Sequence, residues 1–314
     1  MLRNENKLTT RSTNNTYIAA ATSQNTRRAY QSDIRHFQAW GGKLPTNTEQ
    51  ILTYLQTFAV RLNSRTLSRR LVALKNWHIY QGFQDPTAHP SVSKTLAGIL
   101  RTHGKPKEKA PPILPEELMK IVSYLSQEKT LRASRDNALL QLAFFGAFRG
   151  SEIVAISYEH ITWQDKGIEI LIPHSKTDQT HEGQYCAIPY GNHDLCPIRA
   201  LTQWLERSQI TKGPIFYRLH RDNRLGEKPL TSLSVSNILR KRAHDAMLPQ
   251  SEKFSSHSLR RGLATSASRD GASLPAIMRQ GRWKNVNTVM EYIEAALRFD
   301  ENAASSVLKK IHSE

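Results

Sequence analysis

The stretch IEILIPHSKTDQTHEGQYCAIP, residues 168–189, decides the fold class of this 314-residue chain. Two apolar runs, 168–173 and 184–189, flank a polar segment that contains a glycine, and this is the pattern of two strands joined by a turn. The segments on both sides of it carry apolar residues at helical spacing instead. We therefore expect a mainly α fold with a small antiparallel β-sheet, of the α+β class.

The helical segments around the hairpin define a large second domain. One helix is expected at 116–125, and a longer one runs through Phe145 before the strands begin. After Pro197 the helical pattern resumes and continues at 234–246, 257–269, 274–280 and 286–297. The chain ends in a short helix with an apolar stripe, which needs a groove to bury it. The stripe consists of Ala303, Ala304, Val307, Leu308 and Ile311.

The segment GKPKEKAPPILP, residues 104–115, interrupts the helical pattern. Its four prolines and three lysines predict a stiff, extended, basic connector. We place the domain boundary here. The expected parts are a flexible N-terminal tail (1–22), a helical domain (23–104), the linker (105–114) and the second domain with its C-terminal helix (115–314).

Residues 23–104 have the pattern of a small all-helical domain. The first helix, from Ser23, has an apolar face with Tyr30, Phe37 and Trp40. The run TNTE at 46–49 predicts a capping box, and Ser64 is the expected cap of a third helix. Basic residues of that third helix point largely outward in this arrangement: Arg65, Arg69, Arg70 and Lys75.

The charge of the chain points to a polyanionic partner. It has 44 Lys and Arg against 27 Asp and Glu, a formal net charge of +17. Residues 1–110 hold 17 of the basic residues and 5 of the acidic ones. The first third of the chain therefore contributes +12 to the net charge, and the rest contributes +5. A basic excess of this size favours nucleic acid. A basic protein with no specific partner is the alternative.

Cysteine usage and hydropathy exclude other classes. Cys186 and Cys196 have neither zinc-ligand spacing nor the density of a disulfide framework, so a reducing compartment fits and no metal site is expected. No apolar run suggests a signal peptide or a membrane span. We expect a cytoplasmic protein without a cofactor.

An arginine stands in GAFRGSE, residues 146–152, between two expected helices. Gly146 and Gly150 flank Arg149, and in such a turn the guanidinium can point at a ligand. In HSLRRG, residues 257–262, His257 and Arg260 share a helix face. A guanidinium repels a metal ion but binds a phosphate through two parallel N–H bonds. Taken singly, Arg149 is better explained as an ordinary surface arginine, and a basic pair on a helix surface is a common alternative for His257 and Arg260.

Two further motifs bear groups that can take part in phosphoryl chemistry. Lys176, at the hairpin tip, can donate a proton in a cleft, although lysines at such tips often serve solubility. In GRWKNVNTVMEYIE, residues 281–294, Trp283 carries one N–H donor and Tyr292 a hydroxyl that can attack phosphorus. Alone, Tyr292 is more often a buried aromatic. We expect it to leave the apolar helix face formed by Val286, Val289, Met290 and Ile293.

Together these motifs resemble the tyrosine recombinase (phage integrase) family, in particular its Cre-like members. GAFRGSE is similar to the family box TGLRxSE at Arg149 and Glu152, and HSLRR to HxLRH at His257 and Arg260. In the family the box LGH lies nine residues before the tyrosine. QGRW keeps this spacing, since Trp283 lies nine residues before Tyr292. Arg261 and Trp283 depart from the histidines that many members have there. The resemblance extends to NTRRAYQSDIRHFQAW in the first domain and covers nearly the whole chain.

The resemblance implies a catalytic set of six residues with a supporting Glu152. The arginines would hold the scissile phosphate, Lys176 would protonate the leaving 5′-oxygen, and Tyr292 would become joined to the 3′-phosphate. The implied helical N-terminal unit is a SAM-like core-binding domain, and the second is the catalytic domain. The implied catalytic residues are Arg149, Lys176, His257, Arg260, Trp283 and Tyr292.

The implied partner is double-stranded DNA, whose strands would be exchanged by a tetramer of this protein. Accessory DNA-bending proteins and association with the nucleoid are implied as well. The last helix would dock into a neighbouring protomer or pack on its own domain. Neither a metal nor another cofactor is implied. A type IB topoisomerase and a catalytically silent DNA-binding protein remain as alternatives. Candidate DNA contacts are Arg65, Arg69, Arg70, Lys75, Arg240, Lys241 and Arg242.

Overall fold

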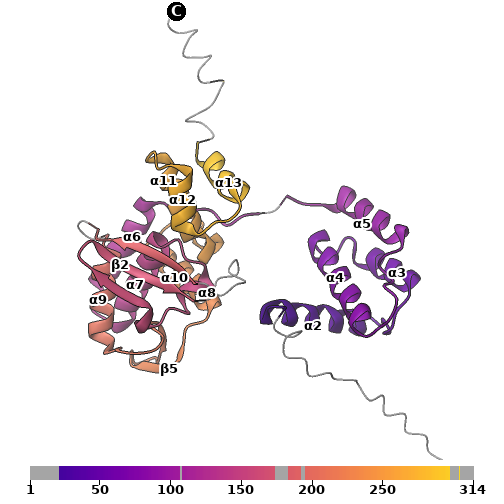
Figure 1. Ribbon diagram of the computed structural model, residues 1–314, viewed down its shortest axis with the longest axis horizontal. Coiled ribbons are helices and arrows are strands. Elements are labelled where there is room, and N and C mark those ends of the chain that lie inside the picture. The colour runs from indigo at the N-terminus through magenta and orange to yellow at the C-terminus, as the bar shows by residue number, and fades with distance from the viewer. Residues whose placement is uncertain (1–20, 107, 174–182, 192–194, 298–303, 305–314) are drawn as a thin grey trace, which may run out of the picture. The chain divides into compact units, whose positions relative to one another are not determined.

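The computed structural model describes residues 21–106, 108–173, 183–191, 195–297 and 304 (Figure 1). The chain divides into two compact units, Met1–Glu108 and Lys109–Glu314. No helix in the described part is long and apolar enough to cross a bilayer.

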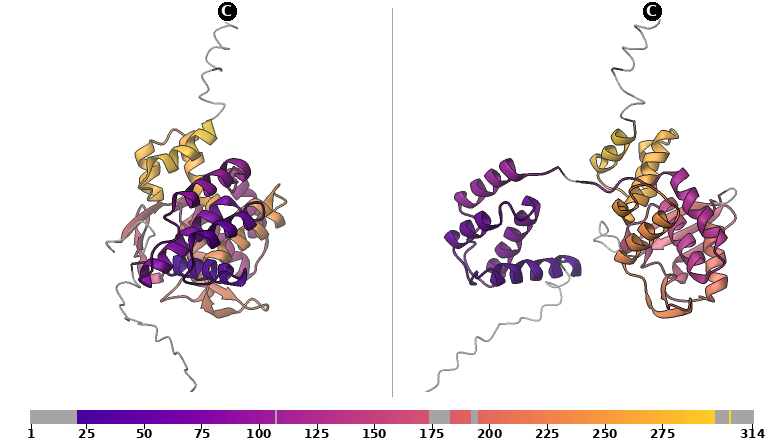
Figure 2. Two further views of the ribbon diagram at one scale, coloured as in Figure 1. Left: turned by 90° about the vertical axis from the view of Figure 1, so that its right-hand side faces the viewer. Right: turned by 180° about the vertical axis from the view of Figure 1, so that it is seen from behind.

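The described residues of the first unit form four helices: α2 (Gln24–Ala39), α3 (Thr48–Phe58), α4 (Ser64–Tyr80) and α5 (Pro90–His103). Their apolar faces meet in one core, in which Phe37 of α2 lies beside Tyr54 of α3 with ring centroids 5.1 Å apart. Figure 2 shows this group from two further directions. The all-helical prediction for this part is confirmed.

Asparagines begin two of these helices, where the sequence predicted a threonine and a serine. The side-chain oxygen of Asn47 accepts from the backbone N–H of Gln50 at 2.9 Å, and that of Asn63 from Arg65 at 2.9 Å. The Thr46 hydroxyl instead donates to the Gln50 side chain. Both N-caps therefore lie one residue away from the predicted position, because the asparagine oxygens reach the free N–H groups of the first turn.

Arg70 lies inside the first unit, so the prediction that it points outward was wrong. Asp33 is 2% exposed and accepts two hydrogen bonds at 2.8 Å from Arg69, while Arg70 Nε is 3.5 Å away. Arg70 also donates to the hydroxyl of Tyr54 at 2.9 Å. Burial raises the pKa of Tyr54, and the charge of Arg70 opposes this only in part. Arg70 thus joins α2, α3 and α4 and is removed from the candidate DNA contacts.

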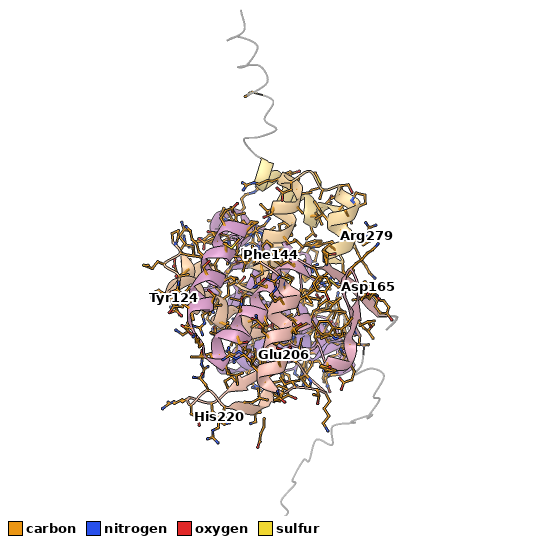
Figure 3. The ribbon with its side chains drawn as sticks, turned by 90° about the vertical axis from the view of Figure 1, so that its left-hand side faces the viewer. Tyr124, Phe144, Asp165, Glu206, His220 and Arg279 are labelled. Carbon is orange, nitrogen blue, oxygen red and sulfur yellow. The ribbon has the colours of Figure 1, made fainter. Side chains whose placement is uncertain are left out.

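The second unit is built around α7 (Leu131–Phe145), of whose 15 residues ten are buried. It contacts α6 (Pro115–Gln127), α9 (Pro197–Ser208) and α11 (Ser256–Arg269). Figure 3 shows Phe144 among these helices and His220 towards the outside. The remaining helices are α8 (Gly150–Ile153), α10 (Ser232–Asp245), α12 (Leu274–Gly281) and α13 (Val286–Leu297), with 3-10 turns at Tyr158–His160 and Ser251–Lys253.

A three-stranded antiparallel sheet covers part of this helical core. Strand β1 (Ile161–Gln164) pairs with β2 (Gly167–Ile172), and β2 pairs with β3 (Gln184–Pro189). The isoleucines of β2 are buried because they alternate towards the helices. This confirms the α+β class and the two strands of the hairpin. Strand β1 and the pair β4 (Tyr217–Leu219) and β5 (Leu225–Pro229) were not predicted, since they are short and largely exposed.

A buried ion network corrects the assignment of Arg242 as a DNA contact. Its side chain is 3% exposed and donates to Asp136 of α7 at 2.7 Å. It also lies 3.4 Å from Glu128 and 3.2 Å from Asp245. Asp136 in turn accepts from Arg135 at 2.6 Å. Arg242 therefore fastens α10 to α7, whereas its neighbour Lys241 is 63% exposed and pairs only with Asp245 among the described residues.

We predict that Arg242→Ala destabilises the protein while Lys241→Ala does not. Removing one member of a buried ion pair leaves an uncompensated charge and costs about 3–5 kcal/mol. An exposed i,i+4 pair contributes about 0.3–0.5 kcal/mol. Denaturant unfolding of both variants measures the difference. Equal free energies of unfolding would contradict the structural role given to Arg242.

Candidate active site

Arg149 occupies a sharp turn between α7 and α8. Gly146 ends α7, Ala147 follows with a φ of 46°, and Arg149 is the N-cap of α8. The backbone N–H of Arg149 donates to Glu152 Oε2 at 2.9 Å, and its guanidinium forms an ion pair with Glu152 Oε1. The arginine keeps 18% of its side chain exposed. The turn thus fixes the guanidinium on Glu152 while part of the side chain stays exposed to solvent.

Glu152 is a buried carboxylate shared among arginines. It is 2% exposed, and Arg282 Nη2 lies 3.1 Å from its Oε2. Arg260 Nη1 lies 4.0 Å from the same oxygen. Burial alone would raise the pKa of Glu152, but Arg282 and then Arg149 lower it below its usual value. The carboxylate is therefore charged at neutral pH and orients the cluster.

Arg260 is a buried cation that is only partly bonded. Its side chain, on α11, is 3% exposed, and Nη1 donates to the carbonyl of Ala147 at 2.5 Å. Its buried Nη2 has no hydrogen-bond partner among the described residues. Burial and then the charge of Arg149 lower the pKa of Arg260 to about 9, although Glu152 opposes them. The side chain stays charged at pH 7, and an anion beside Nη2 would stabilise it.

Close packing between helices brings Arg149 and α11 together. A Cβ on Gly150 would lie 2.7 Å from the Ser232 hydroxyl and 2.8 Å from the Ser256 hydroxyl. Gly150 therefore allows the beginnings of α10 and α11 to approach α8. His257 lies in the first turn of α11, three residues before Arg260, and is exposed.

Trp283 and Tyr292 complete the group around Arg260. Trp283 is 8% exposed, and its ring lies under the Arg260 guanidinium, 4.1 Å from Cζ. A Cβ on Gly281 would overlap this ring at 1.7 Å, so glycine is required there. The rings of Trp283 and Tyr292 have centroids 6.1 Å apart. The structure thus brings Arg149, Arg260, Trp283 and Tyr292 into one neighbourhood.

Tyr292 and its helix differ in part from the prediction. Val289 is fully buried, but Val286 is 44% exposed and does not anchor α13. Tyr292 does not leave the apolar face as expected. It is half-buried against the cluster that contains Val289 and Trp283, because α13 packs on α11 and α12 along this side. Its ring lies 5.1 Å from Cζ of Arg261.

Two predicted features fall outside the described residues. They are Lys176, in the hairpin segment 174–182, and the apolar stripe of the C-terminal helix, of which Ala304 alone is described.

The candidate DNA contacts differ in how exposed their side chains are and in how many bonds these side chains already make within the protein. Arg65 donates to the carbonyl of Lys105, and Arg69 is committed to Asp33 although half of it is exposed. Lys75 is 50% exposed and 3.8 Å from Asp85. Arg240 is half-buried and bonds Asn237 at 2.7 Å. These four and Lys241 remain surface candidates, whereas Arg70 and Arg242 do not.

Sequence reasoning missed two arginines that the fold places at this site. Arg282 binds Glu152 from the loop between α12 and α13, and Arg261 bonds the carbonyl of Ala110 and faces the ring of Tyr292. Burial lowers the pKa of Arg261, and the charges of Tyr292 and Glu291 oppose this lowering. The only signal was their position inside the motifs HSLRRG and QGRW. No group of three or more metal-binding side chains occurs in the described part of the chain.

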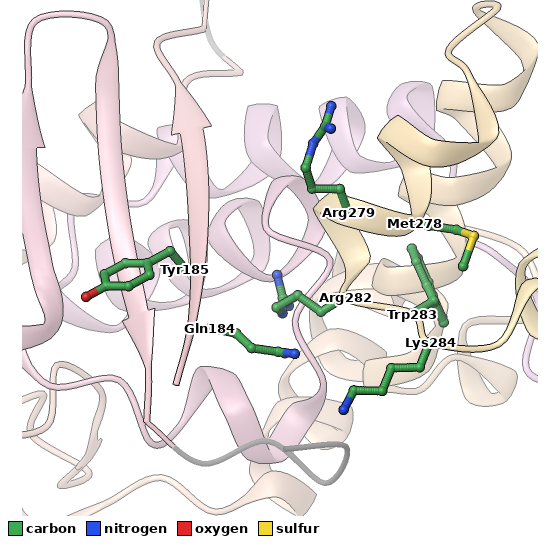
Figure 4. A pocket seen from close by; sticks show the side chains of 7 residues that line it. All are labelled: Gln184, Tyr185, Met278, Arg279, Arg282, Trp283 and Lys284. Carbon is green, nitrogen blue, oxygen red and sulfur yellow. The ribbon is translucent and has the colours of Figure 1, made fainter. Parts of the chain in front are cut away.

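A pocket of about 350 Å³ borders the site between β3 and the α12–α13 loop (Figure 4). In this view the amide of Gln184 points towards Arg282 and Lys284, while the ring of Tyr185 points the other way. Of the candidate site residues, Trp283 and Arg282 line it. Arg149 and Arg260 are not among the described residues that line it.

The fold thus places a cluster of arginines around one buried carboxylate, with Trp283 and Tyr292 beside it. Residues 113–298 match the model of the phage integrase family, and residues 13–81 match its N-terminal SAM-like domain. An integrase/recombinase XerD homolog of Selenomonas ruminantium is 37% identical over 295 residues, which cover 91% of this chain and 86% of the relative. The recombinase Cre of Escherichia phage P1 is 26% identical over 273 residues, 81% and 77% of the two chains.

Solved structures share the fold. A lambda integrase dimer bound to a COC′ core site matches with a TM-score of 0.60 and 17% identity, over 88% of this chain and 74% of that one. The Tn1549 transposon integrase in complex with circular intermediate DNA matches with a TM-score of 0.60 and 15% identity, over 92% and 94%. This chain belongs to the phage integrase family, the tyrosine recombinases, which cleave DNA and exchange its strands.

Proposed function

We propose that Tyr292 is the nucleophile of a site-specific DNA strand exchange and that Arg149 and Arg260 hold the scissile phosphate. One observation carries this assignment: Arg260 is buried beside Arg149, and its Nη2 has no partner among the described residues. A phosphodiester supplies the missing negative charge and accepts the parallel N–H bonds of a guanidinium. Trp283, stacked under Arg260, donates its indole N–H to the same phosphate.

The reaction is a transesterification. The Tyr292 oxygen attacks phosphorus, a bond forms to the 3′-phosphate, and the bond to the 5′-oxygen breaks. Lys176 protonates this leaving oxygen, and His257, exposed at the start of α11, takes the phenolic proton. The phosphotyrosine preserves the bond energy, so a 5′-hydroxyl from a second duplex reverses the step and completes the exchange.

The partner is double-stranded DNA, bound mainly through phosphate contacts. The net charge of +17 supports it, and so do the complexes formed by the lambda and Tn1549 integrases, whose fold this chain shares. Four copies would assemble on two sites, and DNA-bending proteins would assist. Arg65, Arg69, Lys75, Arg240 and Lys241 are the remaining candidates for contacts outside the active site.

A covalent trapping experiment tests this function. A binding site is first selected from a pool of random duplexes and then placed in a duplex nicked close to the expected cleavage point. Loss of the short fragment prevents religation, so the wild-type protein should accumulate a DNA adduct that resists denaturant. A protein that binds the selected site but never forms an adduct would be a silent DNA-binding protein.

The same preparation separates a topoisomerase from a recombinase. A type IB topoisomerase would relax supercoiled plasmids that lack the selected site. We expect relaxation and recombination only when the plasmid carries it, and site-independent relaxation would contradict the proposal.

A further inference from the structure

Arg282 is, with Arg260, a buried arginine of the active site, and the catalytic roles above leave it unused. It is 6% exposed and ends α12 in the left-handed region, at φ 55° and ψ 43°. This backbone conformation is unfavourable for a residue with a side chain and is adopted most easily by glycine. A strained arginine persists where its contacts over-determine it, and such outliers gather at functional sites.

The contacts of Arg282 connect the α12–α13 loop to the turn that carries Arg149. Its Nη1 donates to the carbonyl of Gln280 at 2.8 Å, and its Nη2 to the carbonyl of Gly146 at 3.1 Å. Nη2 also lies 3.1 Å from Glu152 Oε2. The guanidinium stacks on Phe148, with Cζ 4.8 Å from the ring centroid. The side chain thus has a defined place directly behind Glu152.

The geometry at Glu152 shows what this placement achieves. Arg149 holds Oε1 through its guanidinium, and Arg282 holds Oε2. Arg260 Nη1 is 4.0 Å from Oε2, which is too far for a hydrogen bond. Without Arg282, Oε2 would attract Arg260 into a close ion pair. That pair would neutralise the cation that the phosphate needs and rotate its fork away.

The charge of the cluster leads to the same conclusion. The cluster has a formal charge of +2, from Arg149, Arg260 and Arg282 together with Glu152. Without Arg282 its formal charge would be +1. A phosphodiester has one negative charge, and a pentacovalent phosphorus has two. Fixed charges that match the transition state better than the ground state accelerate the chemical step.

We propose that Arg282 is a positioning residue for strand cleavage: it occupies Glu152 so that Arg260 stays directed at the scissile phosphate. This inference rests on the proposed function. It concerns the rate of the covalent step and leaves the affinity for DNA largely unaffected, because Arg282 lies behind the carboxylate.

The test is Arg282→Gly, which suits the left-handed backbone and removes only the side chain. We expect single-turnover cleavage of the nicked duplex to slow by about 10- to 100-fold, with the dissociation constant changed by less than about three-fold. Arg279→Ala removes an exposed cation from the same helix and serves as the matched control, with a change below about two-fold. Arg282→Lys keeps a charge without the fork and should lose about 10-fold.

Two readouts separate positioning from a merely structural contribution. Millimolar guanidinium should restore cleavage by Arg282→Gly several-fold, whereas urea, which has the same shape and no charge, should not. The double variant Glu152→Gln/Arg282→Gly should cleave faster than Arg282→Gly, because the neutral amide no longer attracts Arg260.

Several outcomes would overturn the inference while the proposed function stands. They are wild-type cleavage by folded Arg282→Gly, equal rescue by urea, and no recovery in the double variant. If Arg282→Gly does not fold, wild-type cleavage by Arg282→Lys is decisive against it. Failure of the wild-type protein to form any adduct would instead reject the proposed function and this inference with it.

Discussion

Tyr292→Phe should form no covalent adduct with the nicked duplex and should still bind the selected site with an affinity within about three-fold of wild type. The substitution removes only the phenolic oxygen, which is the proposed nucleophile. The ring keeps its packing against Trp283 and the cluster around Val289, so α13 remains in place. Denaturing gel electrophoresis measures the adduct, and a mobility shift measures binding.

Tyr185→Phe is the matched control, because Tyr185 lies on β3 and is 62% exposed. It should form the adduct at the wild-type rate. An adduct of undiminished yield in Tyr292→Phe would show that another residue attacks the phosphate. Loss of adduct in both variants would point to general damage.

Arg260→Lys should slow cleavage by about 10²- to 10³-fold, as the loss of one preorganised donor typically does. Lysine retains a charge but cannot present two parallel N–H bonds to a phosphate. The melting temperature of the free protein should stay close to that of wild type, because lysine also places a cation near Glu152 and over the ring of Trp283. Single-turnover cleavage and the melting temperature are measured together.

Arg207→Lys makes the same replacement at an exposed arginine of α9 that donates to the carbonyl of Lys129. Its cleavage rate should stay within about two-fold of wild type. If Arg260→Lys cleaves as fast as Arg207→Lys, the guanidinium fork is not what holds the phosphate. If it loses activity and melts much earlier, Arg260 has a structural role instead.

Sequence patterns anticipated most of the framework. The two strands of the hairpin and the helices of both units follow from apolar spacing, because burying one face requires period two in a strand and about 3.6 in a helix. The boxes GAFRGSE and HSLRRG predicted that Arg149 and Arg260 would meet. The short strands β1, β4 and β5 escaped notice, since edge strands of three to five residues bury too little to leave a pattern.

The sequence by itself determined the fold class, the family and the residues that could carry the chemistry. Only the tertiary structure decided which basic residues are free. Arg69 and Arg70 are adjacent in sequence, and so are Lys241 and Arg242, yet one of each pair is buried on an aspartate from another helix. Arg282 is held by Glu152 in the same way. A buried cation needs an anion within a few ångströms, and only the folded chain brings together charges that lie 36 to 130 residues apart.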